Sequence, residues 1–221
     1  MIVVGLRLIS MIVGYVFGTI QTAFFYGKSQ GIDIREHGSG NAGTTNTLRV
    51  LGTKAGLIVF AGDASKCILA ILLIRFTLGE IFPELKYLFI IYTALGVVLG
   101  HDYPFFLGFK GGKGIACTAG LCIAINPWFI PVAAFMFIVP FATTHFVSLG
   151  SLLLNVGLLA QMIFMGQNGM LGASSQGTLN EIYIITLLIA SLAFYQHRAN
   201  IGRLLHGNER KTYLFKKNDA K

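Results

Sequence analysis

Three short polar segments carry most of the side chains in this sequence that could take part in chemistry. They are GSGNAGTTNTLR at 38–49, HDYPFFLGFKGGKG at 101–114 and HRANIGRLLHGNE at 197–209. Each segment combines glycine with cations or other hydrogen-bond donors. A flexible backbone beside cationic side chains is suited to binding an anion such as a phosphate group.

The first segment predicts an anion-binding turn followed by the start of a helix. Its closely spaced glycines let backbone N–H groups turn toward a ligand, and Thr44 or Thr45 can cap the helix that follows. Thr45 and Arg49 are four residues apart, so a hydroxyl and a guanidinium could converge on one phosphate near the helix N-terminus. The alternative is a polar turn in which Arg49 is a cytoplasmic anchor.

The second segment places Lys110 and Lys113 among glycines. It is not a Walker loop, because Leu107 stands at the position of the first glycine and Gly114 replaces the hydroxyl residue that would hold magnesium. What remains is a cationic backbone cradle suited to a phosphate without an obligatory metal. The alternative is a pair of lysines that reach from the membrane edge to water.

The third segment places His197 and Asn200 three residues apart, on one face of the last helix as it leaves the bilayer. The histidine could act as a base or donate hydrogen bonds to a phosphate, and the asparagine could orient either substrate. An anchored interfacial side chain is the alternative for His197. Glu209 is expected to pin the final turn against a basic neighbour.

The elements that position these segments are membrane helices. Hydrophobic residues make up 54% of the chain and charged residues only 12%, a balance too apolar for an ordinary soluble domain. Runs of about the 20 residues needed to cross a bilayer occur near 2–26, 54–78, 85–101, 147–166 and 181–197.

A further apolar region, 115–145, is interrupted by Asn126, Pro127 and Pro131 and predicts two shorter helices. A helix over 115–126 would be only about 18 Å long, so we expect a pair that enters the membrane and returns. The prediction is an all-α polytopic membrane protein of about seven helices, five spanning plus the short pair. Residues 1–221 would form one transmembrane domain, with 210–221 as a frayed tail.

Lysine and arginine outside the apolar runs cluster in the first loop, after the third run and in the tail. Because cytoplasmic loops are enriched in these residues, we expect the N-terminus outside, the C-terminus in the cytoplasm and all three polar segments on the cytoplasmic side. The net charge of +8 reflects this excess, and no nucleic-acid-binding motif accompanies it. Cys67, Cys117 and Cys122 lack metal-ligand spacing and are interpreted as structural thiols.

Two further patterns lie within the apolar runs. Asp63 and Lys66 are three residues apart in mid-helix, and they are either functional intramembrane charges or a self-neutralising ion pair. Glycines spaced by four residues, at 14 and 18 and at 96 and 100, predict close helix packing.

Taken together, the three polar segments resemble, nearly position for position, the three motifs of the bacterial acyl-phosphate:glycerol-3-phosphate acyltransferases, the PlsY family of integral membrane enzymes. The similarity extends to about residue 210. It implies transfer of a fatty acyl group from acyl phosphate to the 1-hydroxyl of sn-glycerol 3-phosphate, giving lysophosphatidic acid and phosphate in the first acylation of phospholipid biosynthesis. It implies no metal or other cofactor, and neither acyl-CoA nor acyl carrier protein as donor. In agreement, no histidine here is followed five residues later by aspartate, the pair that thioester-using acyltransferases carry.

The resemblance also implies which residues form the site. The expected catalytic residues are Ser39, Arg49, Lys113, His197 and Asn200. The expected phosphate-binding residues are Gly38, Gly40, Asn41, Gly43, Thr45, Asn46, Lys110, Gly111, Gly112, Gly114 and Ser148. Two positions depart from the family pattern, since Cys117 replaces a common threonine and His145 lies where a basic residue often precedes SLGS.

The proton acceptor stays open between His197 and a substrate phosphate. We favour the phosphate, because no acidic partner for His197 is evident in the sequence. An acyl-enzyme at Ser39 is less favoured, since the donor is already activated.

The resemblance further implies a monomer in the bacterial cytoplasmic membrane, with its site facing the cytoplasm. The bilayer would be one partner, and an enzyme that makes acyl phosphate from acyl carrier protein would be functionally linked. A transporter or channel for a small phosphate ester is the alternative. It predicts polar residues toward the outer side, where the loops of this chain are bland.

Overall fold

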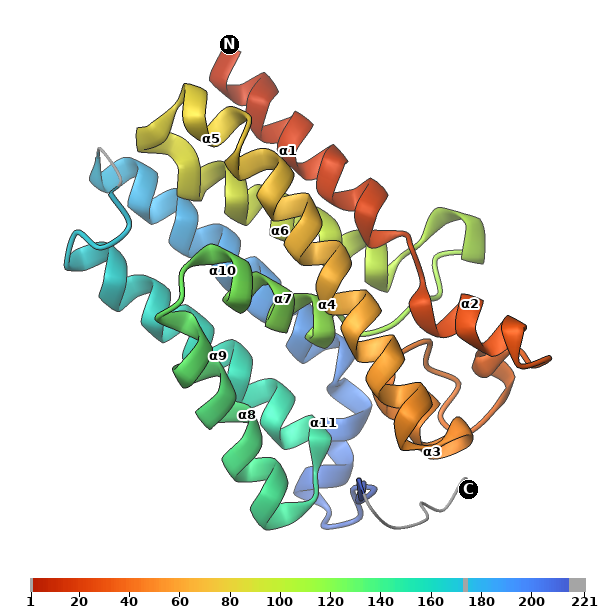
Figure 1. The fold of residues 1–221 in the computed structure, drawn as a ribbon. Coiled ribbons are helices and arrows are strands. Elements are labelled where there is room, and N and C mark those ends of the chain that lie inside the picture. Colours follow the sequence, from red (N-terminus) through yellow and green to blue (C-terminus); the bar gives the residue numbers. More distant parts are fainter. Residues whose placement is uncertain (1, 173–174, 215–221) are drawn as a thin grey trace.

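The computed structural model describes residues 2–172 and 175–214, and all regular secondary structure in these residues is helical. The α-helices, in chain order, are α1 (Ile2–Gly18), α2 (Thr22–Ser29), α3 (Thr44–Leu51), α4 (Thr53–Arg75), α5 (Leu78–Ile81), α6 (Lys86–Asp102), α7 (Ile115–Ile125), α8 (Phe129–Thr144), α9 (Val147–Gln167), α10 (Gln176–Gln196) and α11 (Arg198–Leu205). Short 3-10 turns lie at η1 (Ile34–Glu36), η2 (Pro83–Leu85) and η3 (Phe105–Leu107). The long helices lie side by side along one common direction (Figure 1).

Among the described residues, five segments are long and apolar enough to cross a membrane. They are Ile2–Ser29, Thr53–Ile81, Pro83–Leu107, Val147–Gln167 and Gln176–Gln196. This confirms the prediction of an all-helical protein with five candidate membrane spans. The short helices α2, α3, α5 and α11 are additional to the seven helices expected from the sequence.

The first spanning segment is broken, where the sequence predicts one continuous helix. Helix α1 ends at Gly18 and α2 begins at Thr22, which releases backbone carbonyls inside the protein. The Lys66 ammonium, from α4, donates to the carbonyls of Gly18 (3.0 Å) and Ile20 (2.6 Å). A buried side chain from another helix therefore satisfies the backbone at the break.

Helices α1 and α6 pack backbone against backbone, as the glycine spacing predicts. A Cβ on Gly14 would lie 2.0 Å from the Thr93 carbonyl oxygen, and one on Gly96 would lie 2.0 Å from the Met11 carbonyl oxygen. Any larger residue at these positions would push the two helices apart. The three cysteines are likewise buried in the helix packing and form no disulfide.

The short pair α7 and α8 reaches deeper than its helix lengths suggest. At the far end of α7, the Ile125 carbonyl accepts from Arg75 Nη2 (2.5 Å), and Asn126 Nδ2 donates to the Tyr87 hydroxyl (3.4 Å). Arg75 ends α4 and Tyr87 lies in the first turn of α6, so the turn between α7 and α8 lies level with the opposite ends of spanning helices. Pro131 does not break the pair, since it falls in the first turn of α8, where the missing N–H costs little.

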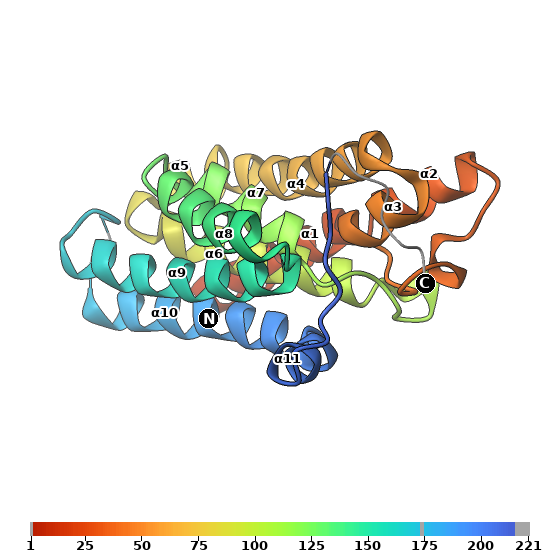
Figure 2. The same ribbon diagram turned by 90° about the horizontal axis from the view of Figure 1, so that it is seen from below.

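The residues after α11 form a C-terminal strap, residues 209–214, so the expectation of a frayed tail is wrong for 210–214. Thr212 N–H donates to the His145 carbonyl (2.9 Å), and Thr53 Oγ1 donates to the Leu214 carbonyl (2.6 Å). Figure 2 shows this dark blue segment running from α11 toward α4. Thr212 is 1% exposed, and its burial and the backbone hydrogen bonds hold this segment in place. Its charged composition alone predicts a disordered tail. The rest of the expected tail, 215–221, lies outside the described residues.

Candidate active site

The loop of the first polar segment is held in shape by Asn46. Its amide nitrogen donates to the carbonyls of Ile34 and His37 (3.0 Å each), and its Oδ1 accepts from the Ser39 N–H (2.8 Å). Both amide hydrogens are therefore used inside the loop. Asn46 borders the site as expected, but its side chain shapes the loop and has no N–H left for a phosphate.

Helix α3 begins at this loop and presents its first residues to a cavity. Gly43 is the N-cap and no side chain caps the helix, so neither Thr44 nor Thr45 has the capping role that the sequence allows. The Thr44 hydroxyl is buried and has no protein partner in the described structure. Thr45 and Arg49 both line the cavity, as predicted from their spacing. Unpaired backbone N–H groups at a helix start favour an anion.

The glycines of the second segment fit the loop against α6. Gly111 N–H donates to the Asp102 carbonyl (3.1 Å) and Gly112 N–H to the His101 carbonyl (3.0 Å). A Cβ on Gly112 would lie 2.0 Å from His101 Nε2. These glycines, with Gly114 and the exposed Lys110, are absent from the cavity wall. Their direct contact with phosphate therefore stays a prediction, and the structure shows Gly111 and Gly112 packed closely on α6.

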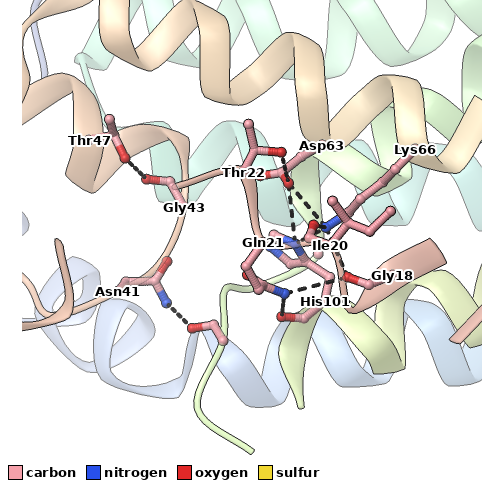
Figure 3. Close-up of polar contacts among 12 residues, drawn as sticks. Gly18, Ile20, Gln21, Thr22, Asn41, Gly43, Thr47, Asp63, Lys66 and His101 are labelled. Carbon is pink, nitrogen blue, oxygen red and sulfur yellow. Dashed lines mark hydrogen bonds and ion pairs between the residues drawn. The ribbon is translucent and has the colours of Figure 1, made fainter. Parts of the chain in front are cut away.

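A buried charge cluster lies beneath this loop (Figure 3). Lys66 Nζ lies 3.1 Å from Asp63 Oδ1 and 2.9 Å from His101 Nδ1, and the Thr22 hydroxyl donates to the same Asp63 oxygen (2.9 Å). Gln21 Nε2 donates to the His101 carbonyl (2.8 Å). Asp63 and Lys66 thus form an ion pair within α4. Lys66 also connects the α1–α2 break to His101, the residue on which the glycine loop packs.

The third segment is organised around Glu209. Its Oε1 accepts from Asn200 Nδ2 (2.7 Å) and from the Ser148 hydroxyl (2.9 Å), while Oε2 pairs with Arg203 Nε (2.8 Å). Asn200 Oδ1 in turn accepts from the Lys113 ammonium. The predicted contact of Glu209 with a basic neighbour is present, and the same carboxylate also links three segments of the chain.

These segments enclose a cavity of about 840 Å³. It gathers twelve of the sixteen predicted site residues, which are Gly38, Ser39, Gly40, Asn41, Gly43, Thr45, Asn46, Arg49, Lys113, Ser148, His197 and Asn200. Beyond this polar end the wall becomes apolar, with Phe60 of α4, Ile123 of α7 and Phe137 of α8 among its residues. Phe60 and Ile123 are 39% and 45% exposed, so the apolar part also opens at the surface of the helix bundle.

The polar end is strongly cationic. Arg49, Lys113, Arg198, Arg203 and Arg210 line the cavity, against the carboxylates of Asp63 and Glu209. Burial lowers the pKa of the Arg49 guanidinium, and burial together with the charge of Arg203 lowers the pKa of Lys113 to about 8. These cations are crowded and partly desolvated, so a bound anion would relieve their mutual repulsion.

His197 is neutral in this environment. Burial, with the charge of Lys113, lowers the pKa of its imidazole to about 4. Its Nδ1 lies 2.7 Å from the Ala193 carbonyl oxygen, and since a carbonyl only accepts, Nδ1 carries the proton. The neutral ring then offers Nε2 as an acceptor.

Residues 8–207 match the sequence model of the family described as glycerol-3-phosphate acyltransferase. The chain belongs to the glycerol-3-phosphate acyltransferase family. This confirms the resemblance seen in the three polar segments.

Curated members of the glycerol-3-phosphate acyltransferase family match over nearly their whole length. The protein of Thermoanaerobacter sp. (strain X514) is 38% identical over 204 residues, 92% of this chain and 94% of that protein. The protein of Clostridioides difficile (strain 630) is 40% identical over 206 residues, again 92% and 94%. Both are named glycerol-3-phosphate acyltransferase.

Crystal structures from the family share the fold. The glycerol 3-phosphate form of PlsY, an integral membrane glycerol 3-phosphate acyltransferase, superposes with a TM-score of 0.79 at 32% identity, covering 95% of this chain and 99% of that one. The lysophosphatidic acid form gives 0.77 at 31% identity, with 96% and 97% covered.

Some cavity residues were not predicted from the family motifs. Thr44, Arg198, Arg203 and Arg210 line the wall, and Glu209 joins its parts. The signal for Glu209 was its place as the acidic residue that closes the arginine-rich third segment. Arg210 lies beyond residues 8–207, which the family model matches, and the three sequence motifs do not include it.

Proposed function

We propose that this glycerol-3-phosphate acyltransferase takes its acyl group from acyl phosphate. It would esterify the 1-hydroxyl of sn-glycerol 3-phosphate, releasing lysophosphatidic acid and inorganic phosphate as the first acylation of phospholipid biosynthesis. One observation carries the proposal: the cavity joins a cationic polar end to an apolar groove that opens between membrane helices. An acyl phosphate has the same two parts.

The polar end would hold the two substrate phosphates. Arg49, the first residues of α3, Ser39 and Lys113 all line this end of the cavity. Cations and backbone N–H groups fixed before substrate arrives can stabilise phosphate charge without reorganising. Asn46, and the packing of Gly111 and Gly112 on His101, would keep these walls in position.

The reaction itself needs little activation, because acyl phosphate is a mixed anhydride. The glycerol hydroxyl oxygen bonds to the acyl carbon, the bond from that carbon to the phosphate oxygen breaks, and the hydroxyl proton ends on phosphate. Holding the hydroxyl beside the carbonyl can contribute about 7–11 kcal/mol. His197 Nε2 would accept a hydrogen bond from the hydroxyl and orient it, and its low pKa makes it a weak base.

Asn200 is proposed to fix the Lys113 ammonium in the site. Its Oδ1 accepts from Lys113 while its Nδ2 is held by Glu209. Because Glu209 accepts from both Asn200 and Ser148, it would set the geometry of this wall without contacting substrate. No cofactor is assigned a role in this scheme.

The protein would act as a monomeric, single-domain unit in the bacterial cytoplasmic membrane. The basic residues near α3, α11 and the second segment lie at the end of the bundle opposite the N-terminus (Figure 1). Because positive residues face the cytoplasm, the N-terminus would be outside and the site would face the cytoplasm. There it would receive donor from an enzyme that makes acyl phosphate from acyl carrier protein.

The test uses purified protein in detergent with palmitoyl phosphate and glycerol 3-phosphate. We expect lysophosphatidate and phosphate in equal amounts, no product from acyl-CoA or acyl carrier protein thioesters, and unchanged rates in a metal chelator. A transporter would make no lysophosphatidate in detergent, where no sealed compartment exists. Consumption of the donor without lysophosphatidate would overturn the proposal.

A further inference from the structure

The C-terminal strap closes one side of the polar end of the cavity. It leaves α11, passes the C-terminal end of α8 at His145 and reaches the first residue of α4, Thr53. It therefore bridges α8 and α4, which both contribute residues to the cavity wall. Figure 2 shows the dark blue segment running from α11 toward α4. Its residues from Arg210 onward lie beyond both the family match, which ends at 207, and the three polar segments.

The strap holds Arg49 directly. Arg49 Nη2 donates to the Thr212 hydroxyl (2.6 Å) and to the Arg210 carbonyl (3.2 Å). Thr212 cannot easily move, because its side chain is 1% exposed and its N–H is bonded to the His145 carbonyl. The Thr212 hydroxyl that accepts from Arg49 is thus held in a fixed position.

Both hydrogen bonds are made by Nη2, yet they orient the whole guanidinium. The group is planar and its five N–H donors form a rigid fork, so anchoring Nη2 sets the direction of the others. Arg49 Nε is buried and has no partner in the described structure, while the residue lines the cavity. A buried N–H without an acceptor is costly, and a substrate phosphate oxygen would supply one.

We infer that Thr212 is a positioning residue, which aims the Arg49 guanidinium at a substrate phosphate by binding its Nη2. The inference rests on the proposed function for the identity of the phosphate. A long arginine side chain loses rotamer freedom when it binds, and the strap imposes that order before substrate arrives. The strap is accordingly part of the site.

The experiment compares three variants by steady-state kinetics. Thr212→Val keeps the shape of the side chain and removes the acceptor, and Thr212→Ser restores it. Thr53→Val removes the other tie of the strap without touching Arg49. For Thr212→Val we expect KM for one of the two phosphate substrates to rise about tenfold, the usual effect of losing a hydrogen bond to a charged group, with kcat changed less than about twofold. Thr212→Ser and Thr53→Val should stay near wild type.

Two further measurements separate positioning from folding. In an Arg49→Lys background, Thr212→Val should add little, because the fork that Thr212 orients is gone. Calorimetric binding of glycerol 3-phosphate and of inorganic phosphate, with thermal unfolding of each variant, gives a readout that does not need turnover. Wild-type KM and phosphate affinity in folded Thr212→Val would overturn the inference, as would a Thr212→Ser variant no better than Thr212→Val.

The two proposals fail in different ways. If wild-type protein makes no lysophosphatidate but Thr212→Val still weakens phosphate binding about tenfold, the acyl-transfer proposal falls and the role of Thr212 stands. If wild-type protein is active and Thr212→Val binds phosphate and turns over normally, the acyl-transfer proposal stands and the role of Thr212 falls.

Discussion

Asn200 accepts a hydrogen bond from Lys113, a residue 87 positions earlier in the chain, and donates one to Glu209. The amide therefore couples the glycine-rich loop before α7 to the end of α11. Its two ends face different partners, a cation at Oδ1 and a carboxylate at Nδ2. An aspartate at this position could serve only the first of these contacts.

Arg49→Ala and Asn200→Ala should abolish turnover while the protein still folds. Loss of the Arg49 guanidinium would leave one phosphate without its cation, and loss of the Asn200 amide would release Lys113. Removal of one preorganised charge-stabilising group costs about 100- to 1,000-fold in rate, so we expect losses of at least that size. Initial rates with both substrates saturating, alongside a thermal unfolding curve, measure this. A near-normal rate in either folded variant would contradict the site.

Phosphate binding should weaken above pH 8. The pKa of Lys113 is about 8, so its charge is present below that pH and is lost as the pH rises through it. A phosphate monoester gains its second charge near pH 6, so KM should be lowest between about pH 6 and pH 8. Lys113→Arg keeps its charge at higher pH and should remove the alkaline rise. An identical alkaline limb in this variant would assign the titration to another group.

Acid should destabilise the protein through His197. Its pKa in the fold, about 4, lies below the ordinary value of 6.5, so the unfolded chain binds the proton more tightly. The resulting stability is complete above pH 6.5 and is lost as the pH falls through 4. Relative to His197→Gln, wild type should lose up to about 3 kcal/mol over this window. Thermal unfolding of both proteins from pH 7 to pH 4 tests this, and parallel curves would show that the ring is not held neutral.

The Asp63–Lys66 pair should prove both structural and functional. Lys66→Met leaves the Asp63 carboxylate buried without its cation, which typically costs about 3–5 kcal/mol. The double variant Asp63→Asn, Lys66→Met should recover most of that stability. It should not recover activity, because Lys66 also binds the Gly18 and Ile20 carbonyls and contacts His101 under the glycine loop. Full activity in the double variant would assign the pair to stability alone.

Local patterns in the sequence predict the spans and the meeting of the polar segments. Hydrophobic length indicates the five spanning segments, charge bias puts the three segments on one side, and the spacing of Thr45 and Arg49 predicts their shared face on α3. The α1–α2 break could not be predicted in this way. It depends on Lys66, which is 46 positions from Ile20, and no window around residue 20 contains that information.

The roles of individual polar residues could not be predicted from the sequence either. Asn46 and Gly112 look like phosphate ligands because their types suit that task, yet their hydrogen bonds and close contacts are used within the protein. The strap was missed because charged residues after a last helix usually fray. Only the position of His145 and Thr53 in three dimensions gives Thr212 and Leu214 something to bind.

The groove that opens between α4, α7 and α8 determines how the reaction must be measured. Its apolar walls have exposed side chains such as Phe60 and Ile130 and would meet the hydrocarbon of the bilayer. The proposed acyl phosphate donor would then approach by two-dimensional diffusion, while glycerol 3-phosphate arrives from water. The relevant donor concentration is then its mole fraction in the membrane or micelle. Diluting the donor with inert detergent at constant bulk concentration would slow the reaction, and the rate would follow the surface composition.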